Sequence, residues 1–567
     1  MGKKRDICRE ICFTGGMTTT PRIPKIGDEE RTPLVTSLLE IIQIQQEQIL
    51  QLKDEMARLK GQKPRPTIKN SALERDSGNK EERGSGTKRP GSTKREKTEK
   101  LEIHETVIVK AHNVPMGSTF KGYEDFTIQD LLLRPHNTLY RRERWKTLQD
   151  GDIVAPLPEE IRTLGGHFGP SLQGFIMYQY YHCHVTQPLI LEQLLELGLD
   201  ISAGQVNCIV VEGNELFHQE KDEILRVGLK VSGHVNVDDT GARHQGRNGY
   251  CTHIGNEMFA WFQSTDSKSR INFLELLRAG GTDYMLNSEA LDYMKAQKLP
   301  MTQMDLMAGC GKRVFEDQEQ WKAVLESLGF TTRRHIRIAT EGALLGSILE
   351  RGTIHPDLVI VSDDAGQFDV FLHALCWIHA ERSINKLVGF NDAQRNALEQ
   401  IRTQLWEFYG ELKAYKQTPG KNKKAELENR FDEIFTTRTC YATLNSALKR
   451  IHKNKSELLL ALKRPDIPLH NNTSESDIRE YVKKRKISGS TRSDPGRRSR
   501  DTFASLKKTC RKLGLGFWAY LNDRLSGKNS ISPLADLIRW RATESLRKLP
   551  LAAHALPVKE LPLQLCA

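Results

Sequence analysis

The sequence lacks the features that mark membrane proteins, secreted proteins and disulfide-stapled domains. No apolar run approaches the 18 or more residues that would span a bilayer, and the basic start Met1–Asp6 is not followed by the apolar core of a signal peptide. The 10 cysteines are scattered through 567 residues without a Cys-x-x-Cys motif, so neither a disulfide framework nor a zinc ribbon is expected. These absences favour a reducing cytoplasm.

Apolar residues are also scarce, since they make up 38% of the chain against about 45–50% in average globular domains. Part of the chain is therefore expected to remain unpacked. Residues 61–100 are the clearest case, because they are rich in Lys, Arg, Glu, Gly, Ser and Pro and predict a disordered basic linker.

What the sequence has in excess is positive charge, concentrated in two stretches. Residues 60–100 contain 13 Lys and Arg against 6 Asp and Glu, and residues 479–512 contain 13 against 3. Their net charges of +7 and +10 together exceed the net charge of +12 for the whole chain. Clustering of this kind indicates a polyanionic partner, of which nucleic acid is the foremost example.

The N-terminal 160 residues contain segments with different sequence patterns. Residues 1–33 predict a flexible tail, and residues 34–60 predict a two-stranded coiled coil that makes a homo-oligomer, with a heptad seam at Leu38, Ile42, Gln45, Ile49, Leu52, Met56 and Leu59. A helix packed on its own protein would show the same pattern. Residues 101–160 carry short extended runs such as Glu105–Lys110 and predict a small β-rich module.

Residues 161–226 predict a helical region. The apolar residues of 188–197 have helical spacing and end at Gly198, and Ser202 with Gln205 forms a capping-box pattern before a second helix. Helix, glycine turn and capped helix outline a helix-turn-helix that places its second helix in a DNA major groove. An ordinary helical hairpin has the same outline, so both interpretations stay open.

From residue 227 the pattern changes to strands at Val235–Asp239, Tyr250–Ile254 and Met258–Gln263, followed by a helix at Ile271–Leu277 and a central strand at Leu358–Val361. This order predicts an α/β, ribonuclease-H-like catalytic domain over residues 227–490, with the first and fourth strands side by side. Two stretches, near 282–354 and 391–465, are expected to be helical insertions. Residues 491–567 form a basic C-terminal region.

Three acidic residues occupy positions that suit a two-metal site. Asp238 and Asp363 each end an apolar run, and Glu475 begins a predicted helix. Carboxylates held at strand ends and on a nearby helix can bind a pair of Mg²⁺ (or Mn²⁺) ions for phosphoryl transfer. Each acid alone has a simpler interpretation, since strand-end Asp residues begin turns and Glu475 could pair with Asn472 in a capping box.

Four segments of this chain resemble the insertion sequence sixty-six family of DDE transposases, of the transposase C type: Val237–Thr240, Ser362–Phe368 with Leu375–Arg382, Pro468–Glu475, and Ile487 through Leu521. The resemblance implies that Asp238, Asp363 and Glu475 are the catalytic, metal-binding carboxylates. It also implies accessory proteins of the same element, paired transposon ends and a bacterial, nucleoid-associated location. Two departures are that residues 101–160 lack the family's zinc-binding cysteines, so no zinc is expected, and that Asp239 replaces the usual Glu.

Basic residues after Glu475 are expected to neutralise DNA phosphates, although a solvated charged face is the alternative. They are Lys483, Lys484, Arg485, Lys486, Arg492, Arg497, Arg498 and Arg500. Cys376 and His379 are expected to pack and hydrogen-bond near the active site rather than to bind zinc. The sequence therefore predicts a DNA transposase acting on transposon ends and target DNA. An inactive DNA-binding or assembly factor and a ribonuclease-H-like nuclease remain the alternatives.

Overall fold

The structure of the chain is a computed structural model that describes residues 166–548, most of 102–158 and a few positions between 32 and 45. The predicted tail and basic linker lie outside these residues, and so does most of the predicted coiled coil. The described positions of that segment are helical, and all of them except the half-buried Val35 are exposed, Leu38 and Ile42 among them. Within the described residues, no helix combines the length and hydropathy required to cross a bilayer.

Residues 102–158 contain less sheet than their sequence suggests. Their described strands are β1 (Arg144–Lys146) and β2 (Asp152–Val154), which form one exposed antiparallel hairpin. The run Glu105–Lys110 is not in a strand. Its three consecutive apolar side chains, Val107, Ile108 and Val109, are exposed and pair with no strand among the described residues.

A helical region leads into the main sheet. It comprises α3 (Pro170–Met177), the π-helical turn η3 (Tyr178–His182), α4 (Gln187–Glu196), α5 (Ala203–Val211) and α6 (Glu215–Val231). Gly198 follows α4 with φ +80°, a conformation that glycine adopts without strain. Ser202 and Gln205 form the predicted capping box at the start of α5, with both reciprocal hydrogen bonds present.

The central sheet has five strands in the order β5-β4-β3-β8-β9. They are β3 (His234–Gly241), β4 (Tyr250–Gly255), β5 (Ala260–Thr265), β8 (Val359–Ser362) and β9 (Leu372–Leu375). The first three are antiparallel neighbours, and β8 joins β3 in parallel, as does β9 with β8. The prediction that the first and fourth strands lie side by side is confirmed, and the mixed sheet is consistent with a ribonuclease-H-like core.

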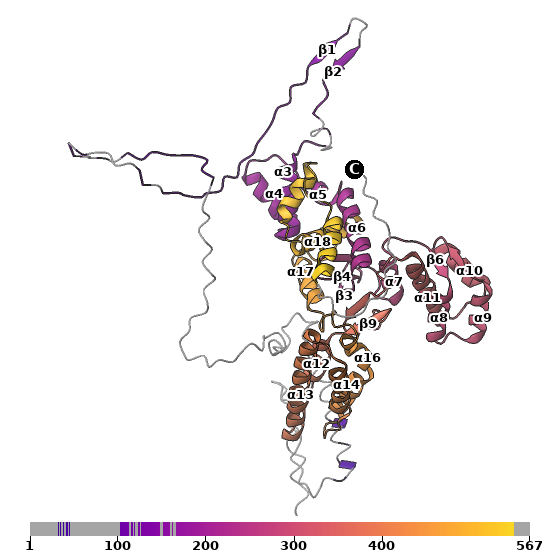
Figure 1. Ribbon diagram of the computed structural model, residues 1–567. Helices are drawn as coiled ribbons and strands as arrows, with labels where there is room; N and C mark the ends of the chain where they lie inside the picture. The colour runs from indigo at the N-terminus through magenta and orange to yellow at the C-terminus, as the bar shows by residue number, and fades with distance from the viewer. Residues whose placement is uncertain are drawn as a thin grey trace, which may run out of the picture. The chain divides into compact units, whose positions relative to one another are not determined.

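Each face of this sheet meets different helices. Val235, Val237, Ile254 and Trp261 belong to the main apolar core, whereas the alternate residues Cys251 and Phe262 pack with Ile478 and Tyr481 of α17 (Asn472–Ser488). The second face is closed further by α18 (Asp494–Lys512), which packs on β5 (Figure 1). Because strand side chains alternate, Asn236 and Asp238 belong to the α17 face.

Between α7 (Arg270–Leu277) and β8 the chain makes a separate small layer. It contains β6 (Tyr284–Leu286), α8 (Ser288–Ala296), α9 (Met301–Gly309), β7 (Arg313–Phe315), α10 (Gln318–Ser327) and α11 (Arg333–Arg351). Helix α11 packs against α7, α8 and β6, which joins the layer to the core.

Helices also fill the stretch between β9 and α17. They are α12 (Trp377–Asn385), α13 (Asp392–Gln417), α14 (Lys421–Thr436), α15 (Ala442–Lys453), α16 (Lys455–Leu458) and the 3₁₀ turn η4 (Leu460–Leu462). After α18 come α19 (Phe517–Leu525) and α20 (Leu534–Lys548), and α20 packs on α6.

The chain divides into two compact units. One includes Glu381–Phe408 and Asn429–Lys453, with Phe408 and Phe431 in ring contact inside it. The other includes Ala72–Ala380, Tyr409–Glu428 and the residues from Asn454 onward. All five strands of the central sheet, α17 and α18 belong to this second unit, and so does every residue of the candidate site below.

Candidate active site

Asp238 and Asp363 are brought to the same edge of the sheet by the parallel pairing of β3 with β8. The register pairs Asn236 with Val361. Asp238 lies two residues beyond that pair on one strand, and Asp363 lies two residues beyond it on the other. Since strands rise by about 3.3 Å per residue, both carboxylates are carried forward by equal steps to neighbouring positions.

Glu475 is delivered to this edge by the start of α17. Asn471 precedes the helix and is fully buried; its Nδ2 donates to the main-chain oxygen of Val237 over 2.7 Å, and its Oδ1 accepts from Asn236 Nδ2 over 2.9 Å. The residue before the helix is thus Asn471 rather than the predicted Asn472, and its side chain makes no cap bond. It fastens the first turn, which contains Glu475, to the strand that contains Asp238.

The charges of the neighbouring carboxylates act on Asp238. Its pKa is raised to about 7, chiefly by burial and also by the charges of Asp363, Asp239 and Glu475, against one main-chain hydrogen bond that lowers it. Both Asp363 and Glu475 are therefore close enough to Asp238 to disfavour its ionised form. A divalent cation among them would reverse this penalty, because opposite charge favours the ionised carboxylate.

The structure separates Asp238 from its neighbour Asp239. Both oxygens of Asp239 accept hydrogen bonds, Oδ1 from Thr252 Oγ1 over 2.5 Å and Oδ2 from Gln367 Nε2 over 3.0 Å. Asp238 accepts from the main-chain nitrogen of Asp239 over 2.8 Å. Because adjacent residues of a strand face opposite sides, Asp238 lies on the side of α17 and Asp239 lies on the other.

The second acidic pair is separated in a similar way. Asp363 is half-buried and its Oδ1 accepts from the main-chain nitrogen of Ala365 over 3.1 Å. Asp364 is exposed, and its Oδ1 accepts from Asn454 Nδ2 over 3.2 Å. Asp363 is therefore the member of this pair that stays at the sheet edge.

Glu475 is flanked by potential cations. His379 Nε2 lies 3.7 Å from Glu475 Oε1, and Arg479 lies 3.5 Å from Oε2. Cys376 is buried, and its Sγ accepts from the main-chain nitrogen of Asn471 over 3.1 Å. Cys376 and His379 thus border the carboxylates through packing and hydrogen bonds, as predicted.

The donor set fits hard divalent cations such as Mg²⁺ and Mn²⁺. It consists of oxygens, it is partly buried, and burial together with the neighbouring negative charges raises the pKa of Asp238. The three carboxylates of this site are not all within 4.8 Å of one another, so the site is more open than a closed cage. Among the described residues, that spacing is reached by a different group, formed by Asp369, His373 and Glu457. Ions at the Asp238 site would draw its side chains inward.

Comparison with known proteins decides the family. Residues 343–499 match the family described as "Transposase IS66 family", a range that contains Asp363 and Glu475. The chain is also 44% identical over 322 residues to the uncharacterized protein y4jO of Sinorhizobium fredii (strain NBRC 101917 / NGR234), which covers 56% of this chain and 100% of the relative. The chain belongs to the IS66 transposase family. The resemblance noted from the four sequence segments is therefore confirmed.

The basic residues after Glu475 of this IS66 transposase have three kinds of environment. Lys483, Lys486 and Arg492 are exposed. Arg485 is half-buried, and it donates to Thr240 Oγ1 over 3.2 Å at the end of β3. These four residues present charge beside the carboxylates or on the adjoining surface.

Two further arginines make ion pairs at the surface. Arg497 donates to Asp266 over 2.9 Å, and Arg498 donates to both oxygens of Glu215 over 3.1 and 2.9 Å. Exposed pairs of this kind contribute little stability, so these arginines can exchange a carboxylate for a phosphate at small cost.

The last two predicted cations face inward. Lys484 is buried and donates to the main-chain oxygen of Tyr180 over 2.8 Å, and burial lowers its pKa to about 7. Arg500 is buried and donates to the main-chain oxygen of Gly489 over 3.1 Å. The expectation of phosphate contact is therefore corrected at these two positions, where tertiary packing turns the charges away from solvent.

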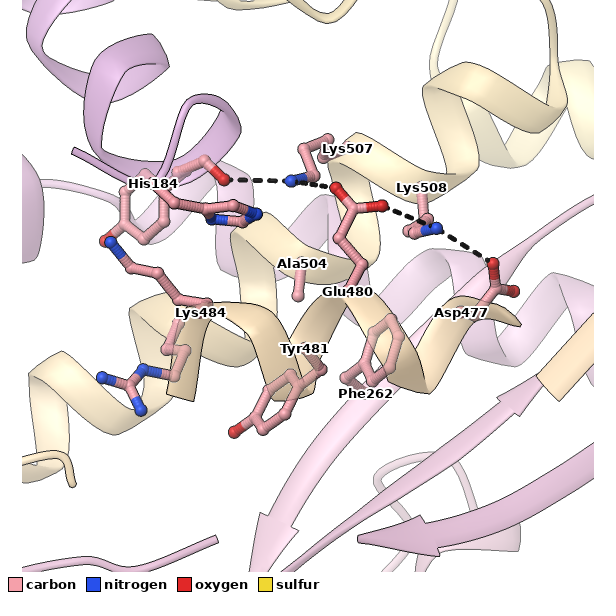
Figure 2. Close-up of a pocket in the computed structure, with 11 residues that line it drawn as sticks. His184, Phe262, Asp477, Glu480, Tyr481, Lys484, Ala504, Lys507 and Lys508 are labelled. Carbon is pink, nitrogen blue, oxygen red and sulfur yellow. Dashed lines mark hydrogen bonds and ion pairs between the residues drawn. The ribbon is translucent and has the colours of Figure 1, made fainter. Parts of the chain in front are cut away.

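Lys484 and Arg500 line a small pocket between α17, α18 and η3, shown in Figure 2. In that view Glu480 lies between Lys507 and Lys508, and Lys508 also faces Asp477 over 3.4 Å. Lys507 and Lys508 are paired with Glu480, and Lys484 and Arg500 donate to main-chain oxygens. The pocket therefore joins α17 to α18 rather than offering a free anion site.

Sequence analysis missed the polar residues that hold the carboxylates in place. Asn236 and Asn471 join β3 to α17, and His253 Nδ1 lies 2.6 Å from Ser474 Oγ beneath the helix start. Asn471 stands inside the motif that singled out Glu475, and Asn236 interrupts the apolar run before Asp238. A polar residue such as Asn236 inside an apolar strand could have indicated a buried hydrogen bond at this position.

Proposed function

We propose that this IS66-family protein cleaves phosphodiester bonds at the ends of an insertion sequence and joins the freed 3′ ends to target DNA. The observation that carries the proposal is the shared electrostatic environment of Asp238, Asp363 and Glu475, which arrive from β3, the end of β8 and the first turn of α17. Hard oxygen donors in this arrangement suit metal-dependent phosphoryl transfer.

We assign metal binding to Asp238, Asp363 and Glu475. Two Mg²⁺ or Mn²⁺ ions bound there would activate a water or a 3′-hydroxyl group and stabilise the leaving oxygen. Asn471 and Asn236 keep the glutamate at a fixed distance from β3. The reaction needs no covalent enzyme intermediate, so it requires no Ser or Tyr nucleophile.

The DNA-binding surface that we propose comprises the exposed and exchangeable cations, namely Lys483, Arg485, Lys486, Arg492, Arg497 and Arg498. Phosphate contacts of this type give affinity that falls steeply with salt and carries little sequence information. The helical region over residues 161–226 is proposed to read the transposon end, with the exposed face of α5 toward the groove. Residues 34–60 are proposed to join two copies.

Purified full-length protein should be incubated with Mg²⁺ or Mn²⁺, labelled end DNA and a target plasmid. We expect end cleavage and strand transfer in the unaltered protein and loss of both in Asp363→Asn, with DNA binding retained. The matched control is Asp364→Asn, which removes the adjacent exposed charge and should retain activity. DNA binding without cleavage in any metal would support an assembly factor instead, and cleavage of RNA–DNA hybrids alone would support a nuclease.

The DNA surface can be tested by the salt dependence of affinity. The double variant Lys483→Gln with Lys486→Gln should reduce the slope of log K against log salt by about 2, since each neutralised phosphate contributes about 0.9. Lys295→Gln, an exposed lysine on α8, should leave the slope unchanged. Equal slopes for all three proteins would remove this surface from the proposal.

A further inference from the structure

A second group of potential metal ligands lies beside the candidate active site and is separate from its carboxylates. Asp369 belongs to the loop that follows Asp363, His373 belongs to β9, and Glu457 belongs to α16. Their ligand atoms all lie within 4.8 Å of one another. The side chains of Asp369 and Glu457 are 60% and 28% exposed, whereas that of His373 is 5% exposed.

The hydrogen bonds of His373 leave one ring nitrogen facing the two carboxylates. Ser362 Oγ donates its proton to the main-chain oxygen of Asp363 over 2.6 Å. Ser362 Oγ therefore acts as the acceptor toward His373 Nε2, which lies 2.8 Å away and carries the ring proton. The neutral ring then carries a lone pair on Nδ1, which is buried without a hydrogen-bond partner. Glu457 Oε1 lies 3.8 Å from Nδ1, beyond hydrogen-bonding distance.

A buried nitrogen lone pair beside two carboxylates is unfavourable unless a cation stands among them. Unsatisfied buried polar atoms are rare in native proteins, and each requires an explanation. Arg270 Nη2 lies 3.8 Å from Asp369 Oδ2, and its Nη1 lies 3.9 Å from Glu341 Oε2, so this guanidinium is shared between two acids and leaves His373 Nδ1 without a partner. The remaining candidates for the central position are a proton on Nδ1 and a metal ion.

We propose that Asp369, His373 and Glu457 bind one divalent first-row transition ion. An imidazole nitrogen favours such ions over Mg²⁺, and carboxylates complete a mixed nitrogen and oxygen set. Metal-binding histidines commonly donate their other ring N–H to a fixed acceptor, which Ser362 supplies here. Ligand atoms around such an ion are about 3.4 Å apart at bond lengths near 2.1 Å, so the exposed carboxylates need to move by about 1 Å.

An ion at this position would hold three segments together. It joins the loop after Asp363, strand β9 and helix α16, and the hydroxyl of Ser362 links His373 to the main chain of Asp363. The three ligands are thus positioning residues for Asp363 if the proposed function holds. Metal binding itself does not depend on that function, so the two proposals can fail separately.

The test uses full-length protein carrying Asp238→Asn, in excess Mg²⁺, so that the carboxylates of the candidate active site do not dominate. Mn²⁺ is the probe, because the thiolates of the chain's cysteines prefer softer ions and should not compete for it. Its binding is followed by electron paramagnetic resonance. We expect one Mn²⁺ ion whose pulsed spectrum shows coupling to an imidazole nitrogen. Asp369→Asn and Glu457→Gln should each weaken its binding at least tenfold.

Glu257→Gln is the matched control, since Glu257 also lies beside a histidine, with His234 Nε2 at 3.5 Å, but the described residues offer no third ligand there. This variant should retain the Mn²⁺ affinity and the nitrogen coupling. Unchanged affinity in both Asp369→Asn and Glu457→Gln, or bound Mn²⁺ without nitrogen coupling, would overturn the proposal.

Discussion

The side-chain amide of Asn471 donates to the main-chain oxygen of Val237 over 2.7 Å. Val237 immediately precedes Asp238, and Asn471 lies one helical turn before Glu475, whose main-chain nitrogen donates to Asn471 over 3.1 Å. One buried hydrogen bond therefore sets the distance between two carboxylates that are 237 positions apart in the chain. The geometry of the candidate site depends on a residue that is not itself acidic.

Replacing Asn471 with alanine should destabilise the protein and weaken its metal binding. The change removes the buried donor to Val237 O and leaves Asn236 Nδ2 with only its longer contact to His470 O, 3.4 Å away, and each buried group left unsatisfied costs about 1–3 kcal/mol. We expect a lower free energy of unfolding in urea and a larger Mn²⁺ dissociation constant. Asn472→Ala, one residue further along, is the matched control and should have smaller effects on both; equal effects of the two substitutions would contradict the anchoring role.

Asp238 and Asp239 should respond differently to the same substitution. Asp238 lies on the side of α17 with Glu475, whereas both oxygens of Asp239 accept hydrogen bonds on the other side. Asp238→Asn should therefore reduce Mn²⁺ affinity and strand transfer by roughly 100-fold or more, and Asp239→Asn should reduce them by less than about 10-fold. Calorimetry and single-turnover assays measure the two effects. A reversed order would assign the metal to Asp239.

The stability of the metal-free protein should depend on the protonation of Asp238. Its folded pKa of about 7 lies above the usual value of 3.8, so the folded state holds this proton more tightly than the unfolded state. The stabilisation is complete below about pH 4 and is lost as the pH rises to about 7, a change of up to about 4 kcal/mol. Asp238→Asn should remove this loss and stabilise the metal-free protein above pH 7.

Chemical denaturation at several pH values, with a chelator present, compares the two proteins. The difference in their free energy of unfolding should grow between about pH 4 and about pH 7 and then level off. Added Mg²⁺ should shrink that difference, because the bound cation favours the ionised carboxylate. A difference that stays constant across this range would show that Asp238 titrates at its ordinary pKa.

The carboxylates and the sheet could be predicted from the sequence because both depend on local pattern. The runs that end at Asp238 and Asp363 are apolar and short, and each of the four predicted strands begins and ends within two residues of its observed bounds, whereas β9 was not predicted. The inward turn of Lys484 could not be predicted in this way. Its carbonyl partner, Tyr180, is 304 positions distant, so a run of four basic residues gives no indication of which one is buried.

The same limit applies to the expected β-rich module. The β-branched apolar run within Glu105–Lys110 is typical of a strand, but a strand needs a partner, and a partner is a tertiary property. Only the hairpin β1–β2, whose strands are close in the chain, forms among the described residues of 102–158. Local contacts were predictable there, whereas long-range contacts were not.

The last prediction concerns the ion pairs between α17 and α18. Burial alone would raise the pKa of Glu480, but its contacts with Lys507 and Lys508 outweigh burial and hold it at about 2, below the usual 4.5. The ionised form is thus favoured in the folded state. Its stabilisation is present above about pH 4.5 and is lost as the pH falls to about 2.

Glu480→Gln should therefore lower the free energy of unfolding near neutral pH by about 3 kcal/mol. Part of that loss arises because Lys507 and Lys508 are buried and would lose a counter-charge. The gap between the variant and the unaltered protein should narrow as the pH falls below about 4.5. Glu326→Gln, an exposed acid on α10, should match the unaltered protein throughout. A gap for Glu480→Gln that is independent of pH would mean that packing, rather than charge, joins these helices.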